Sequence, residues 1–443
     1  MTIKLSDNFT FKKLLRFTLP SIVMMVFTSI YGIVDGFFVS NFAGKTEFAS
    51  VNFIMPYLMI LSAVGFMFGT GGSALVGKVL GEGNTERASK LFSLIITSTI
   101  IVGTALTVLG LVFLRPVASL LGAEGKMLDG CVRYGKIIIA FQTAYMLQVE
   151  FQSFFVTAER PKLGLIFTLL SGIANMILDA LFVGVFKWSI EGAAWATAVS
   201  QIVGGIGPIF YFLSKKNCSL LRLVRHGFDG GALLKTVTNG SSELMSFISS
   251  SVVGMLYNVQ LMKYAGENGV ASYGVIMYVS MIFGAIFIGY SIGSAPVISY
   301  HYGANNTPEL KNLRKKGLTI ITIFSVVMTS LCLLLASPLS ALFVGYDKAL
   351  FEMTKRGFFF FAFCYLFCGF AIFGSSFFTA LNNGLVSAII SFFRTLVFQL
   401  GSILLLPIWL GLDGIWLSLI VAEFMAFALS IAFMIALRKK YDY

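Results

Sequence analysis

Two aspartates stand inside apolar stretches of this chain. Asp35 is the only charged residue between Arg16 and Lys45, and Asp179 is the only one between Lys162 and Lys187. An ionisable group in an apolar environment is costly, and it usually lines a cavity or faces a partner. Both carboxylates are therefore candidates for ion chemistry.

Polar side chains accompany the two aspartates. Asn175 lies one helical turn before Asp179, and helix lengths place Thr197 at a similar depth to both acids. Carboxylate, amide and hydroxyl oxygens suit a hard cation such as Na⁺, whereas burial beside a like charge favours proton uptake. We expect these four residues to couple H⁺ or Na⁺, and the plainer alternative is hydrogen bonding between helices.

A second polar group follows the helix expected at 134–157. Tyr145, Gln148 and Gln152 share one face of it, and Tyr31 shares a face with Asp35. We expect these four residues to bind substrate, although a polar stripe also suits contacts between helices. Glu150 points to the other side of its helix, where it is either an inner gate or a structural group.

Three further charged residues lie within or near apolar runs. Arg394 and Glu423 are expected on neighbouring helices, and an ion pair is the favoured interpretation over contact with substrate. Glu243 is expected near the start of its helix, in a helix-terminal role.

Other chemistries find little support in the sequence. The five cysteines form no CxxC pair, and the two histidines, His226 and His301, lie in or beside loops. The segment from Gly72 to Val79 resembles a phosphate-binding loop, but Val79 replaces the Ser or Thr that would ligate magnesium. We therefore expect no enzyme, no cofactor and no resident metal.

The elements that position these residues are membrane helices. The 443 residues are 57% hydrophobic and 12% charged, against roughly one quarter charged in soluble proteins. A span needs about 20 apolar residues. The sequence predicts an all-α polytopic membrane protein with twelve helices, at 13–40, 48–76, 91–114, 134–157, 162–184, 190–214, 232–262, 269–300, 317–337, 355–380, 386–408 and 413–437.

The basic residues predict the orientation. Of the 32 Lys and Arg, 21 lie on the side that carries both termini, 10 lie on the other side, and Arg394 lies within a helix. The positive-inside rule places both termini in the cytoplasm of a cell inner (plasma) membrane protein. Topology also explains the net charge of +12, so no nucleic-acid partner is expected.

The two halves of the chain repeat at a constant separation of 222 residues. Gly44 matches Gly266, Gly81 matches Gly303 and Asn84 matches Asn306. Six spans in each half make the repeat parallel. We expect a lobe at 1–220 and a lobe at 221–443, which together form an alternating-access transporter; a duplication without transport is the alternative. Tyr257 and Gly401 stand where Asp35 and Asp179 would recur, so the acidic site is not duplicated.

Several segments resemble the multidrug and toxic compound extrusion (MATE) family, closest to its DinF-like and MepA-like bacterial branch. They are Leu19–Val39, Gly81–Asn84, Asn175–Phe182 and Glu191–Thr197, and the resemblance extends over nearly the whole chain. It implies two six-helix lobes and a cation site in the first lobe. The family's site residues fall on Asp35, Asn175, Asp179 and Thr197.

The resemblance also implies an activity. Members export organic cations and amphiphilic drugs, which are xenobiotics, as antiporters driven by inward H⁺ or Na⁺ flow. The expected partners are such small molecules and membrane lipids, and the chain is expected to act as a monomer. The alternative is a flippase for lipids or lipid-linked saccharides from the same superfamily.

Overall fold

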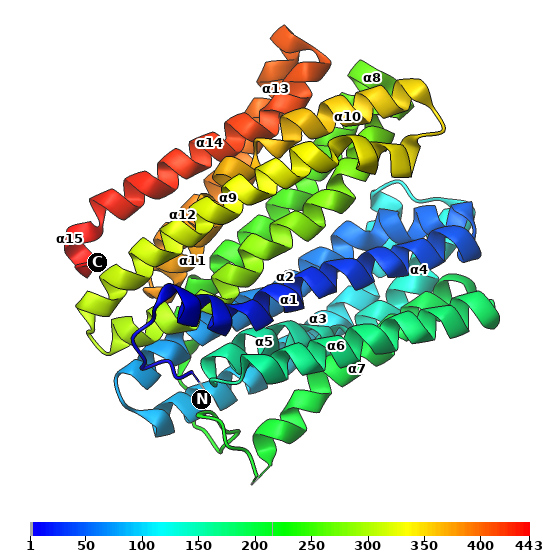
Figure 1. The fold of residues 1–443 in the computed structure, drawn as a ribbon. Helices are drawn as coiled ribbons and strands as arrows, with labels where there is room; N and C mark the ends of the chain where they lie inside the picture. Colours follow the sequence, from blue (N-terminus) through cyan, green and yellow to red (C-terminus); the bar gives the residue numbers. More distant parts are fainter. Residues whose placement is uncertain (1–2, 215) are drawn as a thin grey trace.

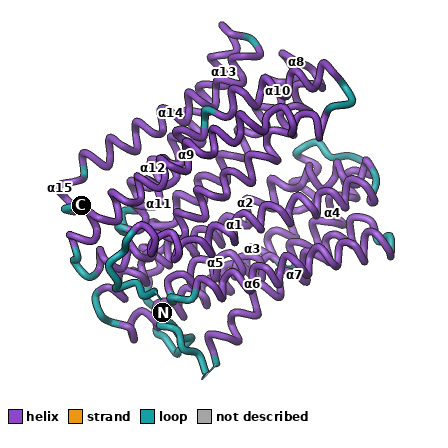
Figure 2. Tube along the Cα trace, viewed as in Figure 1, coloured by secondary structure: helices purple, strands orange, loops and turns teal. Residues whose placement is uncertain are grey.

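The computed structural model describes residues 3–214 and 216–443, apart from the side chain of Lys45, and within these ranges it consists of helices and short loops (Figure 2). Fifteen α-helices and three π-helical segments, labelled η, follow one another. In chain order they are α1 (Phe11–Phe38), η1 (Val39–Ala43), α2 (Lys45–Gly81), α3 (Thr85–Leu120), α4 (Gly125–Ala140), α5 (Gln142–Thr157), α6 (Pro161–Asp179), η2 (Ala180–Val185), α7 (Ser189–Leu213), α8 (Gly230–Gly303), α9 (Thr307–Val344), α10 (Lys348–Ala362), α11 (Tyr365–Ala380), α12 (Gly384–Phe392), η3 (Phe393–Phe398), α13 (Gln399–Leu410), α14 (Leu412–Ala436) and α15 (Arg438–Tyr441).

The helices form two bundles, α1–α7 and α8–α15, as the lower and upper halves of Figure 1. α2 packs along α8, and α1 also contacts α8, so the first two helices of one bundle face the first helix of the other. Both termini lie at the same end of the molecule (Figure 1). An all-helical fold in two bundles confirms the predicted fold class.

The helices are long and apolar enough for a multi-pass membrane protein. Nine of them within the described residues satisfy length and hydropathy criteria for a span, or ten when the bent pair α10 and α11 is one span. α8 has 74 residues, which would extend roughly 110 Å as a straight helix. It breaks at Gly266, whose φ of 61° is not helical, so α8 consists of two helices. α4 and α5 together occupy the region of one predicted span, and the total of twelve remains a prediction.

Equivalent backbone features recur at the 222-residue separation of the sequence repeat. Gly44 before α2 and Gly266 within α8 both have positive φ. The Asn84 side chain caps α3 by accepting from Arg87 N, and the Asn306 side chain caps α9 by accepting from Glu309 N. Such caps satisfy backbone donors that the first helical turn leaves free. The two halves therefore begin corresponding helices with the same local chemistry.

Glycines bring the two bundles into backbone contact at the end that carries the termini. A Cβ at Gly81 would overlap the carbonyl oxygen of Tyr300, and a Cβ at Gly303 would overlap that of Lys78. These two contacts are exchanged by the 222-residue repeat, so they are related by its pseudo-twofold axis.

Toward the opposite end the bundles separate (Figure 1). A Cβ at Gly32 or Gly36 of α1, or at Gly254, Gly274 or Gly284 of α8, would meet no atom within 4 Å. The close glycine contacts between the bundles therefore lie at the end that carries the termini.

Two segments outside the helices reinforce the closed end. The N-terminal segment buries Leu5 and Phe9. Leu5 N donates to Glu159 of the first bundle at 2.6 Å, and Phe9 N donates to Glu309 of the second at 2.8 Å. This segment therefore connects the two bundles.

The linker after α7 packs against the first bundle. Val224 N donates to Ser93 Oγ of α3 at 2.8 Å, and Arg160 donates to the carbonyl of Cys218 at 2.8 Å. The lobe boundary between residues 220 and 221 remains a prediction.

Candidate functional site

Both aspartates in the apolar runs of the first bundle, Asp35 and Asp179, adjoin a π-helical segment. Asp35 lies one turn before the end of α1, which continues into η1, and Asp179 is the last residue of α6, directly before η2. A π turn widens the helix and changes the direction of neighbouring side chains, and such turns are frequent at functional sites. α1 packs on α6, and η1 contacts η2, so the two widened turns lie together.

Asp35 and Asp179 lie close enough for the charges of their carboxyl groups to interact. Asp179 is fully buried, and neither of its oxygens has a hydrogen-bond donor among the described residues. The buried Oδ1 of Asp35 also lacks one. Unpaired buried oxygens are costly, so this pair is suited to take up a proton or a cation.

Asn175 and Thr197 complete the group predicted from the sequence. Asn175 Nδ2 donates to Thr197 Oγ1 at 3.3 Å, which joins α6 to α7. The amide oxygen of Asn175 is buried and has no donor among the described residues. Asn175 lies one turn before Asp179, so its free oxygen and the two carboxylates come from adjoining helix turns. The fold brings the four residues together, and their role in coupling remains to be tested.

Sequence reasoning missed Tyr134. This residue of α4 is buried, and it lies close enough to Asp35 and Asp179 to interact electrostatically with both. It lies in an amphipathic stretch with several charged residues, and it has no fixed spacing from either acid. Only the packing of α4 brings it to the pair.

The residues predicted to bind substrate are also neighbours. Gln148 Nε2 donates to Ser171 Oγ at 3.2 Å, and Gln152 Nε2 lies 3.5 Å from Thr168 Oγ1, so both amides join α5 to α6. Tyr31 lies near Gln148, and Tyr145 lies near Tyr31. The two glutamines therefore contact the neighbouring helix, while Oε1 of Gln148 has no donor within the described residues. Substrate binding by this set remains a prediction.

The second bundle lacks a comparable acidic site at the equivalent place. Tyr257, which corresponds to Asp35, is buried and its hydroxyl lies 2.7 Å from Ser418 Oγ. Its ring stacks on Tyr273 with centroids 5.1 Å apart. Gly401, which corresponds to Asp179, has nothing within 4 Å of where a Cβ would lie. The chemistry of the two bundles is thus different, as the sequence predicted.

The remaining embedded charges are accounted for differently. Arg394 Nε binds Glu423 with contacts of 3.1 and 2.8 Å, which confirms the predicted ion pair. Glu243 was expected at a helix end; it lies more than three turns inside α8, near enough to Arg394 for their charges to interact. That expectation was wrong, because position 243 is about three turns from the helix start even when the helix is counted from the predicted residue 232. Glu150 is fully buried beside Thr99 of α3, on the side away from Gln148.

The chain matches one family model in both bundles. The model, MatE, matches residues 20–181 and 244–403. These segments contain most of α1, all of α2–α6 and most of α8–α13, and the first of them includes Asp35, Asn175 and Asp179.

Two curated relatives are multidrug export proteins named MepA. The protein of Staphylococcus haemolyticus (strain JCSC1435) is 28% identical over 324 residues, which are 73% of this chain and 71% of the relative. That of Staphylococcus aureus (strain NCTC 8325 / PS 47) is 25% identical over 344 residues, 78% of this chain and 76% of the relative.

Solved structures share the fold. A multidrug resistance MATE family transporter of the MOP superfamily in an outward-facing conformation superimposes with a TM-score of 0.91 at 21% identity, over 98% of both chains. A MATE in complex with MaL6 gives a TM-score of 0.92 at 20% identity, again over 98% of both chains. At these identities the likeness establishes the architecture.

Proposed function

Because the chain belongs to the MatE family, we propose that it is a multidrug efflux antiporter that exports organic cations and amphiphilic drugs in exchange for H⁺ or Na⁺. The MepA relatives are multidrug export proteins by name, which supports this substrate class. The coupling ion, the antiport and the cytoplasmic location of the termini are parts of the proposal.

One observation carries the coupling mechanism. The oxygens of Asp179, Oδ1 of Asp35 and the amide oxygen of Asn175 are buried and lack donors within the described residues. A cluster of free oxygens attracts a small cation or a proton. Binding of either neutralises the pair of carboxylates, and the altered charge then changes which conformation is favoured.

The arrangement of the bundles supports alternating access. They touch through glycine backbones at the end with the termini, and their helices diverge toward the other end. With the termini in the cytoplasm, this state is open to the outside. An exporter in this state releases its substrate to the outside and takes up the coupling ion. The outer end then closes and the cytoplasmic end opens.

The test is transport into or out of proteoliposomes. A fluorescent organic cation is loaded, and either a proton or a sodium gradient is imposed alone. We expect one gradient to drive efflux, and Asp179→Asn and Asp35→Asn to abolish the driven component with the protein still folded. Asp129→Asn, an exposed acid on α4 of the same bundle, is the matched control. Wild-type efflux by both site variants would refute the coupling role.

A lipid or lipid-linked saccharide flippase is the competing function. The same vesicles containing a fluorescent lipid distinguish the two functions. A flippase moves the lipid between leaflets, and neither gradient then drives efflux of the organic cation. Lipid movement together with no cation efflux would replace the proposal, and would make the acidic group structural.

A further inference from the structure

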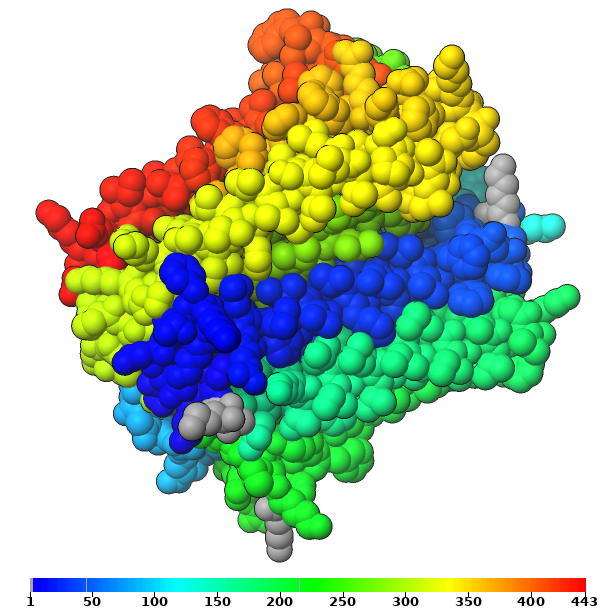
Figure 3. All heavy atoms as spheres, in the orientation of Figure 1, coloured from blue at the N-terminus to red at the C-terminus, as the bar shows by residue number. Residues whose placement is uncertain are grey.

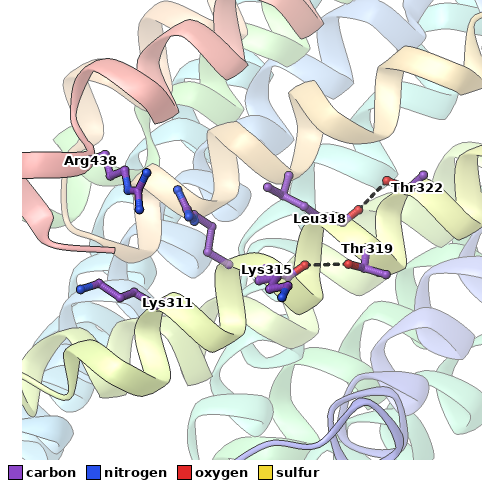
Figure 4. A pocket seen from close by; sticks show the side chains of 7 residues that line it. Lys311, Lys315, Leu318, Thr319, Thr322 and Arg438 are labelled. Atoms are coloured by element: carbon purple, nitrogen blue, oxygen red, sulfur yellow. Dashed lines mark hydrogen bonds between the residues drawn. The ribbon is translucent and has the colours of Figure 1, made fainter.

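A basic pocket lies at the start of α9, outside the site described above. Its volume is about 420 Å³, and its walls include Lys311, Arg314, Lys315, Thr319, Thr322 and Arg438. The first five occur at the spacing of one helix face. Figure 4 shows Arg438, which enters from α15, on the opposite side of the pocket from Lys311.

The positive charge of this pocket is only partly balanced. Lys311 binds Asp442 at 2.9 Å, and Lys315 and Arg438 take part in no ion pair within the described residues. Arg314 lies over the ring of Tyr443 at 5.3 Å, and its buried Nε has no hydrogen-bond partner in the described part of the chain. Three cations therefore face the pocket without an acidic partner.

The hydrogen-bond donors that the pocket offers to a ligand are its lysine and arginine side chains. The hydroxyl groups of Thr319 and Thr322 donate to carbonyls of α9 itself, at 2.9 and 2.8 Å (Figure 4). A ligand therefore meets guanidinium and ammonium groups, which bind phosphate through charge-assisted hydrogen bonds.

The pocket lies at the boundary between charged and apolar surface. From Gly317 to Tyr346 the chain has no charged residue. The same face of α9 continues into exposed Val326, and α14 exposes Ile435 one turn before Arg438. Figure 3 shows the start of α9 (yellow-green) and the C-terminal residues (red) side by side at the surface. A ligand with an anionic head and an apolar tail matches this sequence of surfaces.

The repeat shows that the fold itself does not require this charge. Ser89, Phe92 and Ser93 occupy the places in the first bundle that Lys311, Arg314 and Lys315 occupy in the second. There the linker covers the surface, because Val224 N donates to Ser93 Oγ. The basic surface is thus peculiar to the second bundle, where no linker covers it.

We propose that this pocket binds the headgroup of an anionic phospholipid, with its acyl chains along the apolar surfaces of α9 and α14. Basic pockets at the membrane boundary bind such headgroups. The bound lipid joins α9 to the C-terminal segment, two parts of the second bundle that are far apart in sequence.

Native mass spectrometry of the purified full-length protein tests this proposal. The protein in detergent is titrated with phosphatidylglycerol, and separately with phosphatidylcholine. We expect retained phosphatidylglycerol and about tenfold or more weaker retention in Lys315→Gln/Arg438→Gln. Lys439→Gln/Lys440→Gln is the matched control, because it removes the same charge from exposed positions of α15 outside the pocket lining.

Each outcome decides the proposal. Equal losses in the two double variants would show general electrostatic attraction, and unchanged retention in both would place the lipid elsewhere; either result overturns the site. Full competition by millimolar inorganic phosphate would show a soluble-anion site instead. Lys315 and Arg438 are exposed, so folding should survive. If the double variant does not fold, the single change Arg438→Gln in the same titration replaces it.

Discussion

At the scale of single residues, the two bundles treat buried charge in opposite ways. In the first bundle, Asp179 is buried with both oxygens lacking donors among the described residues. In the second, Glu423 is only 3% exposed, and Arg394 binds it through two contacts. A paired charge is stable where it is, whereas an unpaired one lowers its energy by binding a proton or a cation. Ion chemistry is therefore expected from the first bundle.

Breaking the Arg394–Glu423 pair from one side should destabilise the protein. Arg394→Met leaves a buried carboxylate without its cation, which costs about 3–5 kcal/mol. Arg394→Met/Glu423→Met removes both charges and should cost less than Arg394→Met alone. Denaturation of the variants in one detergent measures this. A double variant that is as unstable as the sum of its single changes would show that the pair contributes no coupling energy.

Glu159 predicts a pH effect outside the membrane spans. It lies in the turn between α5 and α6, where burial raises the pKa of its carboxyl group above the ordinary value, against the opposing hydrogen bond from Leu5 N. The folded state then binds this proton more tightly than the unfolded chain. Its contribution to stability is complete below the unfolded pKa and is lost as pH rises through the folded one.

Glu159→Gln checks this, since glutamine keeps an oxygen that accepts from Leu5 N. As the pH rises from about 4 to about 8, the melting temperature of the wild type minus that of the variant should decrease. A relative stability that rises over this range would contradict the stated direction.

At the scale of elements, glycines decide how closely α2 and α8 approach. Gly81 faces Tyr300 and Gly303 faces Lys78, and each position lacks room for a Cβ beside the opposing carbonyl. Since the pseudo-twofold axis exchanges the two contacts, they should be of similar strength. The π segments act in the other direction, because they widen α1 and α6 next to the aspartates.

Gly81→Ala and Gly303→Ala should both weaken the contact between the bundles. Overpacking of this kind costs about 1–3 kcal/mol, with similar values expected at the two positions. Gly254→Ala is the control, because it lies in the same helix α8 with nothing within 4 Å, and alanine there should stabilise by up to about 1 kcal/mol. Thermal melting in one detergent ranks the three. Equal effects at Gly254 and Gly303 would refute the role of close approach.

At the scale of the whole molecule, the bundles meet at the end that carries the termini, and their helices diverge toward the other end (Figure 1). The N-terminal segment reinforces the closed end by bonding to Glu159 and Glu309. Alternating access requires this end to open when the other closes. The two lobes would then rock about the middle of their interface, where Phe66 of α2 stacks near Phe247 of α8 at 4.6 Å.

Distances between spin labels should therefore change in opposite directions. Labels at Ser40 and Met262 report the open end, and labels at Glu82 and Ala304 report the closed end; each pair is related by the repeat. When the pH or the sodium concentration is changed to drive the switch, the first distance should shorten and the second lengthen. Asp35→Asn/Asp179→Asn should lose this response. Two distances that change in the same direction would contradict rocking of rigid lobes.

The sequence alone determined the class of the molecule and the identity of its embedded charges. Apolar runs predict membrane-spanning helices because a backbone buried in lipid must satisfy its own hydrogen bonds, which a helix does whichever neighbours it packs against. The repeat, the confirmed fold class and the Arg394–Glu423 pair also followed from residue types and spacing, and the family followed from the resemblance of several segments to known members. Asp35, Asn175, Asp179 and Thr197 were named because a polar residue in an apolar run is visible without any partner.

Only the tertiary structure decided what those side chains meet. Tyr134 near the aspartates, the bonds of Gln148 and Gln152 to α6, and the position of Glu243 beside Arg394 depend on how helices rotate and pack. The basic pocket joins Lys315 to Arg438 across 123 positions of sequence. Helical periodicity fixes which residues share a face, but the neighbour of that face is chosen by the packing of the whole chain.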